Sequence, residues 1–292
     1  MSISITDLAA IRARHPEAIA EAAARRVRRP LIGDSGRLMI VAADHPARGA
    51  LGVGDRRLAM ADRADLLERL CTALSRPGVD GVLATADILE DLLLLGVLDD
   101  KVVMGSMNRG GLAGASFEMD DRFTGHRAED IARLRFDAAK LLLRVDYDDP
   151  GSLTTLESTA RAIDAMAALR LPLFVEPFLS RRIDGRVRND LSAEAVTKSI
   201  AIASGLGGTS AYTWLKLPVT DDPDDMAEVL ETSTLPVVLL GGEVGDDQEG
   251  AYERWRKALA LPTVQGMVVG RSLLYPAEGS VETAVDTAVG LL

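Results

Sequence analysis

The sequence predicts an α/β protein, a single (β/α)8 TIM barrel preceded by an extra N-terminal helix. Eight short apolar segments follow one another along the chain, as is typical of parallel strands that are buried on both faces. Segments with helical periodicity separate them. The length of 292 residues suits a barrel formed by one domain, here 1–292, with a helical extension over 1–30.

The first half of the chain contains four strand–helix units. We expect one amphipathic helix over 5–29, which Pro30 ends. The strands are expected over 37–46, 81–85, 101–106 and 139–146, and the helices over 57–75, 87–95, 126–136 and 152–169. A long glycine-rich loop over 107–125 follows the third strand.

The second half repeats this pattern. The strands are expected over 173–177, 211–218, 236–242 and 264–271, and the helices over 192–204, 224–231, 247–259 and 281–291. A polar loop is expected directly after the fifth strand. The runner-up fold is an open doubly wound sheet, but no G-x-G-x-x-G motif follows the first strand to support a dinucleotide site.

Composition narrows the function classes. The formal charge of -11 argues against nucleic acids and anionic membrane surfaces as partners. No membrane-spanning segment or signal peptide is recognised, so we expect a cytoplasmic protein. Cys71 is the only cysteine, and of the three histidines only His45 lies at a strand end. These counts favour neither a disulfide framework nor a cysteine- or histidine-rich metal centre.

Lys216 lies at the end of the sixth strand, in the most apolar and aromatic surroundings of any lysine in the chain. Burial disfavours the charged amine and lowers its pKa. A lysine in that state can form a Schiff base with a carbonyl substrate. The alternative is an ordinary strand-end lysine that reaches solvent or pairs with a carboxylate.

Polar residues also gather where the other strands end. Barrels place their active sites at the carboxyl ends of the strands, so this concentration favours an enzyme. Asp44 and Glu176 supply carboxylates at the first and fifth strands. The candidate substrate-binding residues at the strand ends are His45, Ser106, Asn108, Arg109, Arg144 and Asp146.

The last two strands end in glycine-containing turns, Gly241-Gly242 and Gly270-Arg271. Glycines let backbone N–H groups approach an anion, and these two loops form the common phosphate site of barrels. Arg271 adds a charge-assisted contact. The alternative is a pair of tight turns with a surface arginine.

Four arginines form a basic island after the fifth strand. They surround Asp184-Gly185, in a chain whose net charge is negative. The island could attract an anionic substrate, or it could be an exposed hairpin or a subunit contact. Its members are Arg181, Arg182, Arg186 and Arg188.

Several of these segments resemble class I aldolases, namely Ala42 to Pro46, Lys140, Val175 to Pro177, Leu215 to Pro218 and Val269 to Arg271. The resemblance runs from about residue 37 onward and is closest to the deoxyribose-phosphate, tagatose-bisphosphate and archaeal-type fructose-bisphosphate aldolases. With its segments 105–111 and 117–125, the sequence is similar to an actinobacterial group of deoxyribose-phosphate aldolase-like barrels linked to inositol catabolism.

The resemblance implies a role for each catalytic candidate. Lys216 would form the Schiff base, and Glu176 would act as general acid or base. Asp44 would contact substrate hydroxyls or assist proton transfer, and Lys140 would keep the Lys216 amine neutral. Gly241, Gly242, Gly270 and Arg271 would hold a phosphate.

The substrate is also implied by the resemblance. It would be 2-deoxy-5-keto-gluconate 6-phosphate, cleaved to dihydroxyacetone phosphate and malonate semialdehyde. Neither a metal nor another cofactor would be needed, and a homo-oligomer is expected.

One departure and three alternatives qualify this assignment. Deoxyribose-phosphate aldolase has a second lysine on the strand after its Schiff-base strand, and 236–242 has none.

Arg144 and Asp146 have no counterpart in the family and are candidates to bind a substrate carboxylate. The alternatives are a Mg²⁺-dependent enzyme with Asp44, Asp146 and Glu176 as ligands, an acyltransferase on the same barrel, and a non-catalytic phosphosugar-binding barrel.

Overall fold

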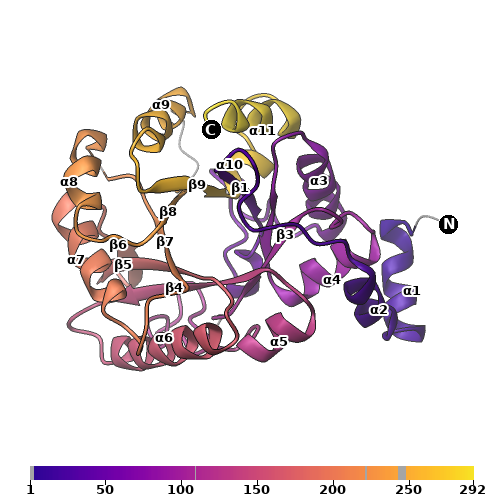
Figure 1. The fold of residues 1–292 in the computed structure, drawn as a ribbon, viewed down its shortest axis with the longest axis horizontal. Coiled ribbons are helices and arrows are strands. Elements are labelled where there is room, and N and C mark those ends of the chain that lie inside the picture. The colour runs from indigo at the N-terminus through magenta and orange to yellow at the C-terminus, as the bar shows by residue number, and fades with distance from the viewer. Residues whose placement is uncertain (1–2, 109, 221, 243–247) are drawn as a thin grey trace.

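The computed structural model describes residues 3–108, 110–220, 222–242 and 248–292. Eight parallel strands form a closed barrel with helices on its outside (Figure 1), which confirms the predicted fold. The pairings of β9 with β1 and of β4 with β5 close the ring. Its strands are β1 (Leu38–Ala42), β2 (Gly81–Ala84), β3 (Val102–Ser106), β4 (Ala138–Val145), β5 (Leu173–Ile183), β7 (Thr213–Leu217), β8 (Val237–Leu240) and β9 (Val264–Val269).

Helices follow the strands and cover the barrel. Side-chain caps define several of their starts; Asp62, for example, accepts hydrogen bonds from the backbone N–H groups of Ala64 and Asp65 at the start of α3. The helices are α3 (Arg63–Ser75), α4 (Ala86–Leu94), α5 (Ala128–Arg133), α6 (Gly151–Ala168), α7 (Ala193–Ser204), α8 (Met226–Leu230), α9 (Gln248–Leu259), α10 (Arg271–Leu274) and α11 (Val281–Val289). Short 3-10 turns occur at η1 (Ile5–Asp7), η2 (Pro46–Arg48) and η3 (Pro223–Asp225).

The N-terminal extension differs from the prediction. The single helix expected over 5–29 is wrong, because the chain forms two helices, α1 (Leu8–Arg14) and α2 (Ala18–Arg25). Pro16 lies between them, and a proline inside a helix removes a backbone donor and clashes with the preceding turn. His15 accordingly leaves the helical region, with φ -140° and ψ 56°.

The segment after the fifth strand is a hairpin rather than a polar loop. β5 continues to Ile183, and the chain returns as the antiparallel strand β6 (Arg186–Asn189). Asp184 and Gly185 have φ of 49° and 75°, the left-handed values that a two-residue hairpin turn of the Asp-Gly type requires. The four arginines of the basic island therefore lie on the two strands of a hairpin.

The hydrophobic core has two main parts. One cluster fills the inside of the barrel and includes Ile40, Met104 and Phe174, all fully buried. A larger cluster lies between the barrel and its helices and includes Leu66, Val175 and Leu239. Successive side chains of a strand point to opposite faces, so alternate residues supply the two clusters.

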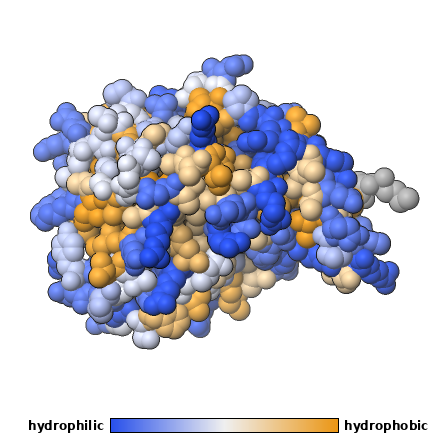
Figure 2. All heavy atoms as spheres, turned by 60° about the horizontal axis from the view of Figure 1, so that its bottom comes forward, coloured by the Kyte–Doolittle hydropathy of each residue, from blue (hydrophilic) through white to orange (hydrophobic). Residues whose placement is uncertain are grey.

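One face of the molecule has both polar and apolar areas on its surface. Figure 2 shows one face, on which hydrophilic side chains surround separate hydrophobic areas. Within the described part of the chain, no helix combines the length and apolar character needed to cross a bilayer.

Candidate active site

The interior of the barrel changes from apolar to polar toward the carboxyl ends of the strands. On β5 the interior residue Phe174 is followed two positions later by Glu176, and on β4 Ala138 is followed by Lys140. The period of two keeps each pair on the same face of its strand. The polar side chains therefore lie directly above a packed apolar layer, which positions them and excludes water from below.

These side chains line a cavity of about 970 Å³ at the carboxyl ends of the strands. This is the end at which barrel enzymes bind their substrates. All four predicted catalytic residues line it, as do the predicted phosphate-binding residues and two of the substrate-binding candidates, His45 and Arg144.

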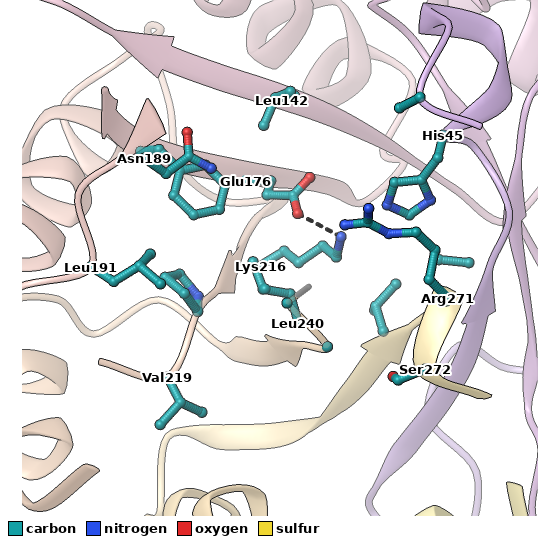
Figure 3. Close-up of a pocket in the computed structure, with 18 of the residues that line it drawn as sticks. His45, Leu142, Glu176, Asn189, Leu191, Lys216, Val219, Leu240, Arg271 and Ser272 are labelled. Carbon is teal, nitrogen blue, oxygen red and sulfur yellow. Dashed lines mark hydrogen bonds and ion pairs between the residues drawn. The ribbon is translucent and has the colours of Figure 1, made fainter. Parts of the chain in front are cut away.

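Glu176 joins two lysines in the centre of the cavity. The Nζ atom of Lys216 donates a hydrogen bond of 2.7 Å to Oε1 of Glu176 (Figure 3). Lys140 forms an ion pair with Oε2 of the same carboxylate. Lys140 also donates a hydrogen bond of 3.2 Å to Oδ2 of Asp44. Two lysines and two carboxylates, each less than 10 % exposed, thus form one buried chain of charges.

The surroundings of these groups shift their proton affinities. Burial lowers the pKa of Lys216, the charge of Glu176 opposes this, and the nearby charge of Lys140 lowers the pKa further. Burial alone would raise the pKa of Glu176, but Lys140 and Lys216 overcome that effect and bring it down to about 2. The site therefore holds a fixed carboxylate next to a lysine that loses its proton more readily than usual.

Asp44 is held from both sides. Its Oδ2 accepts hydrogen bonds from Lys140 and, at 3.2 Å, from the hydroxyl of Ser106. Ser106 is fully buried and does not line the cavity, so the structure gives it contact with Asp44 in place of the expected direct position in the cavity.

His45 and Arg271 lie on the same side of the cavity. Figure 3 shows the Arg271 side chain extending from the start of α10 toward the Lys216 amine, with the His45 ring beside it. Burial lowers the pKa of His45 to about 3; Asp44 opposes this shift, whereas the charges of Arg271 and Lys216 strengthen it. The imidazole is therefore neutral near neutral pH.

The backbone of the turns after β8 and β9 requires glycine at two positions. A Cβ atom on Gly270 would lie 2.4 Å from the carbonyl oxygen of Ala42, so only glycine fits there. Gly242 has φ of 69°, the left-handed region that favours glycine. Ser272 also lines this part of the cavity, and its buried hydroxyl has no hydrogen-bond partner in the described part of the chain.

Sequence reasoning missed Ser272. It directly follows the predicted Gly270-Arg271 turn, and its position in that turn was the one available signal.

Other predicted residues shape the walls. Asn108 is fully buried; its amide nitrogen donates to Asp121 at 3.0 Å, and its oxygen accepts the backbone N–H of Leu142 at 2.8 Å. It thereby fixes the loop after β3 against β4, and it does not line the cavity. The predicted candidate Arg109 lies outside the described residues.

Arg144 and Asp146 have different positions relative to the cavity. Arg144 lines the cavity, but its guanidinium is paired with Glu118, at 2.6 Å from Oε1. Asp146 lies outside the cavity lining, where its carboxylate accepts the backbone N–H groups of Asp148 and Arg182. It therefore supports the β5–β6 hairpin, and the geometry does not place it where a substrate carboxylate would bind.

Comparison with known families gives a direct match. Residues 36–289 match the family described as Cgl0159-like. The chain belongs to the Cgl0159-like family. The crystal structure of Cgl0159 from Corynebacterium glutamicum (Brevibacterium flavum) is similar, with 54 % sequence identity and a TM-score of 0.95, over 99 % of this chain and 97 % of that one. No curated protein sequence matches this chain.

More distant structures share the fold of this Cgl0159-like barrel. A Schiff base-forming fructose-1,6-bisphosphate aldolase is 20 % identical, with a TM-score of 0.64 over 94 % of this chain and 99 % of that one. An archaeal fructose 1,6-bisphosphate aldolase gives the same identity and TM-score, over 94 % and 98 % of the two chains. At this identity the likeness establishes the barrel fold alone.

The described carboxylates of the Cgl0159-like barrel form no shared metal-binding group. Among the residues that the structure describes, no three histidine, cysteine or acidic side chains lie close enough to hold one ion. Of the three acids in the magnesium alternative, Asp44 and Glu176 are bridged by Lys140. The third, Asp146, lies outside the cavity lining. The arrangement instead suits amine chemistry, with a lysine, a carboxylate and a second cation in contact.

Proposed function

We propose that this chain is a class I aldolase that cleaves a phosphorylated keto sugar acid through a Schiff base on Lys216. The main support is the buried contact between Lys216 and Glu176, with Lys140 on the other oxygen of the carboxylate. A structural ion pair would not require a 970 Å³ cavity around it. The fold shared with Schiff base-forming aldolases is consistent with this chemistry.

The reaction would begin at the lysine amine. Neutral Lys216 attacks the ketone carbon of the substrate and forms a carbinolamine, and loss of water then gives an iminium. The lowered pKa of Lys216 increases the fraction of neutral amine at any given pH. Glu176 is within hydrogen-bond distance of the reacting nitrogen, so it can accept and return the protons of these steps.

Carbon–carbon cleavage would follow from the iminium. A carboxylate removes the proton of the hydroxyl two carbons from the iminium carbon, and the bond between the intervening carbon and the hydroxyl-bearing carbon breaks. Its electron pair moves into the iminium and forms an enamine while the aldehyde leaves. Protonation of the enamine carbon and addition of water release the second product and restore Lys216. We assign the proton transfers to Glu176 and the hydroxyl contact to Asp44.

The phosphate would bind close to the lysine. In a ketose with its phosphate on the carbon next to the ketone, the anion lies near the Schiff base. Figure 3 shows Arg271 extending toward the Lys216 amine, with Ser272 on the same side of the cavity. Gly241, Gly242 and Gly270 also line the cavity, and a Cβ atom on Gly241 would lie 3.4 Å from the Ser272 hydroxyl. This arrangement favours dihydroxyacetone phosphate as the ketone product.

The specific substrate that we propose is 2-deoxy-5-keto-D-gluconate 6-phosphate, as in the inositol-catabolism group that the sequence resembles. Its ketone lies next to the phosphate-bearing carbon. Cleavage of its bond between carbons 3 and 4 yields dihydroxyacetone phosphate and malonate semialdehyde, with all atoms accounted for. The arginine-rich walls of the cavity suit a substrate that has a carboxylate as well as a phosphate.

The test of this function is a synthesis assay. Dihydroxyacetone phosphate and malonate semialdehyde are mixed with the protein, and the six-carbon keto acid phosphate is measured by mass spectrometry. We expect product with the wild type and with Arg28→Ala, a control far from the cavity, and none with Lys216→Met. Equal product with wild type and Lys216→Met would contradict the proposal.

We also propose that the chain folds as one domain and works as a homo-oligomer in the cytoplasm. Several large hydrophobic side chains are exposed on the isolated chain, among them Leu153 at 73 % and Tyr147 at 69 %. Light scattering of the purified protein tests this, and a monomeric mass at micromolar concentration would refute it.

A further inference from the structure

The cavity has an apolar wall on one side of the reacting lysine. Leu142, Phe178 and Leu240 are each less than 10 % exposed and form a hydrophobic cluster of their own. Leu191 packs against them from the loop after β6, on the side opposite Arg271 in Figure 3, and all four apolar residues line the cavity. The cluster is separate from the apolar layer beneath the charged residues, and the steps of Schiff-base formation do not use it.

The register of β4 and β5 places this wall next to the reacting groups. Leu142 is the Cα partner of Glu176, and it follows Lys140 by two residues, so it points into the barrel as Lys140 does. Phe178 follows Glu176 by two residues, about 6.6 Å along β5, and has the same orientation. The wall therefore begins beside the carboxylate and continues toward the carboxyl ends of the strands.

Leu240 completes the wall from β8. Val238, two residues before it, is the Cα partner of Lys216 and belongs to the apolar layer inside the barrel. Leu240 therefore also lies on the inner face, one step farther toward the carboxyl end than Lys216. Figure 3 shows Leu142 and Leu240 on opposite sides of the contact between Lys216 and Glu176.

We propose that Leu142, Phe178 and Leu240 determine the specificity for the aldehyde product, because the carbon next to its carbonyl carbon lies against them. They select an aldehyde without a hydroxyl group on that carbon. This inference rests on the proposed aldolase function and assigns the class of the aldehyde half of the substrate: aldehydes with a methylene group next to the carbonyl group.

The orientation of the substrate brings that carbon to the wall. The phosphate, near Arg271, fixes one end. The carbon chain continues from the Schiff base of Lys216 away from this end, and the hydroxyl that loses its proton has to lie near Glu176. The next carbon is one bond, about 1.5 Å, farther. Since Leu142 flanks Glu176 and Phe178 follows it along β5, this carbon contacts apolar side chains.

The wall offers no partner for a hydroxyl group. Leucine and phenylalanine side chains have neither donors nor acceptors. The backbone of Leu142 is already bonded, because its N–H donates to Oδ1 of Asn108 at 2.8 Å and its carbonyl oxygen accepts the Asn108 amide. A buried hydroxyl group without a partner is unfavourable, since it loses its hydrogen bonds to water, whereas a methylene group gains from apolar contact.

The charged residue beside this wall is bound elsewhere. Arg144 is the Cα partner of Phe178, but its Nη1 donates to Oε1 of Glu118 at 2.6 Å and its Nη2 donates to the Glu118 carbonyl oxygen at 3.0 Å. Glu118 is itself fixed, because its Oε2 accepts the backbone N–H of Gly114 at 2.8 Å. A hydroxyl group at the wall would have to compete with a carboxylate for Arg144.

The test compares two aldehydes that differ by one hydroxyl group. Malonate semialdehyde has a methylene group between its aldehyde and its carboxylate, and tartronate semialdehyde has a hydroxyl-bearing carbon there. Each is condensed with dihydroxyacetone phosphate, and kcat/KM for the two aldehydes is measured with the same preparation of protein. The ratio of the two values does not depend on the fraction of the protein that is active.

We expect the wild type to prefer malonate semialdehyde by about 10- to 100-fold. Leu240→Asn introduces a hydrogen-bonding side chain of similar size and should lower this ratio by about fivefold or more. Phe178→Tyr adds one hydroxyl group to the wall and should also lower it. Leu240→Met keeps the wall apolar and should keep the ratio, as should Leu153→Asn, a matched control on α6 at a residue that is 73 % exposed.

Two outcomes would overturn the inference. One is a wild type that uses both aldehydes equally or prefers tartronate semialdehyde. The other is a wild-type preference that is unchanged in both Leu240→Asn and Phe178→Tyr. Absence of product with both aldehydes would instead refute the proposed aldolase function itself.

Discussion

Two buried carboxylates of this barrel each lie between two cations, one directly before β4 and the other within the neighbouring strand β5. Asp137 directly precedes β4 and pairs with Arg26 and Arg28. Glu176 lies within β5, above the apolar layer and facing the cavity, and pairs with Lys140 and Lys216. In the sequence each is a single acid in or next to an apolar strand segment, yet their surroundings in the fold give them different roles.

The arginine cluster is held by backbone groups as well as by its carboxylate. Arg26 also donates to the backbone carbonyl groups of Lys101 and Arg135, and Asp137 accepts the backbone N–H of Val103 at 2.9 Å. An arginine stays charged in proteins, and its fork fits these acceptors. The cluster joins the N-terminal extension to the amino ends of the strands, away from the large cavity, so we interpret it as structural.

The lysine cluster can change its protonation state. A lysine changes its protonation readily when buried, and here burial and a second lysine lower the pKa of Lys216. The cluster also lines a cavity open to ligands. The comparison teaches that a buried acid between two cations indicates chemistry only where the cations can lose a proton and a substrate can reach them.

Glu176→Gln should have the largest effect on function. It removes the proton acceptor next to Lys216 and leaves two lysines without a carboxylate between them. We expect the cleavage rate to fall by about 10²- to 10⁴-fold, measured by steady-state kinetics. If the variant kept wild-type turnover, the proton transfers would have to be assigned to Asp44.

Asp137→Asn should instead affect stability. It leaves Arg26 buried without its carboxylate, and breaking a buried ion pair costs about 3–5 kcal/mol in the free energy of unfolding. Urea denaturation measures this loss. Trapping of a Schiff base by the folded fraction should stay at the wild-type level, and a selective loss of trapping would show that the two clusters are coupled.

Lys140→Met should change the pH dependence. The charge of Lys140 lowers the pKa of Lys216, so its removal raises that pKa. A higher pKa means that the neutral amine forms only at higher pH, so the trapping rate of the variant should rise at more alkaline pH than that of the wild type. A profile unchanged or displaced toward acid would contradict the proposed role of Lys140.

Arg28→Ala should have the smallest effect. The Arg28 side chain is 43 % exposed, and its pairing with Asp137 is therefore screened by solvent. We expect a loss below about 1 kcal/mol in the free energy of unfolding and unchanged catalysis. A loss as large as that of Asp137→Asn would mean that Arg28, rather than Arg26, holds the acid in place.

The sequence was informative where local patterns determine structure. Apolar runs that end in polar residues predicted the eight strands and brought Lys216, Glu176, Asp44 and Lys140 to one end of the barrel, because parallel strands present their carboxyl ends together. The break at Pro16 could also have been predicted, because a proline inside a helical pattern interrupts the helix.

Contacts between distant loops could not be predicted in this way. The partner of Arg144 is Glu118, which lies in a loop whose path no periodicity describes. Asp146 lies at a strand end like the other candidates, but the hairpin captures its carboxylate. Such pairings depend on the folded course of two loops, which residue patterns along one segment do not determine.

The most direct test of the central claim is the mass of the protein after treatment with dihydroxyacetone phosphate and borohydride, followed by peptide mapping. A Schiff base on Lys216 predicts one reduced adduct, located on the peptide that contains Lys216 and absent from Lys216→Met. An adduct on another lysine, or none at all, would contradict the account of Lys216 as the reacting amine.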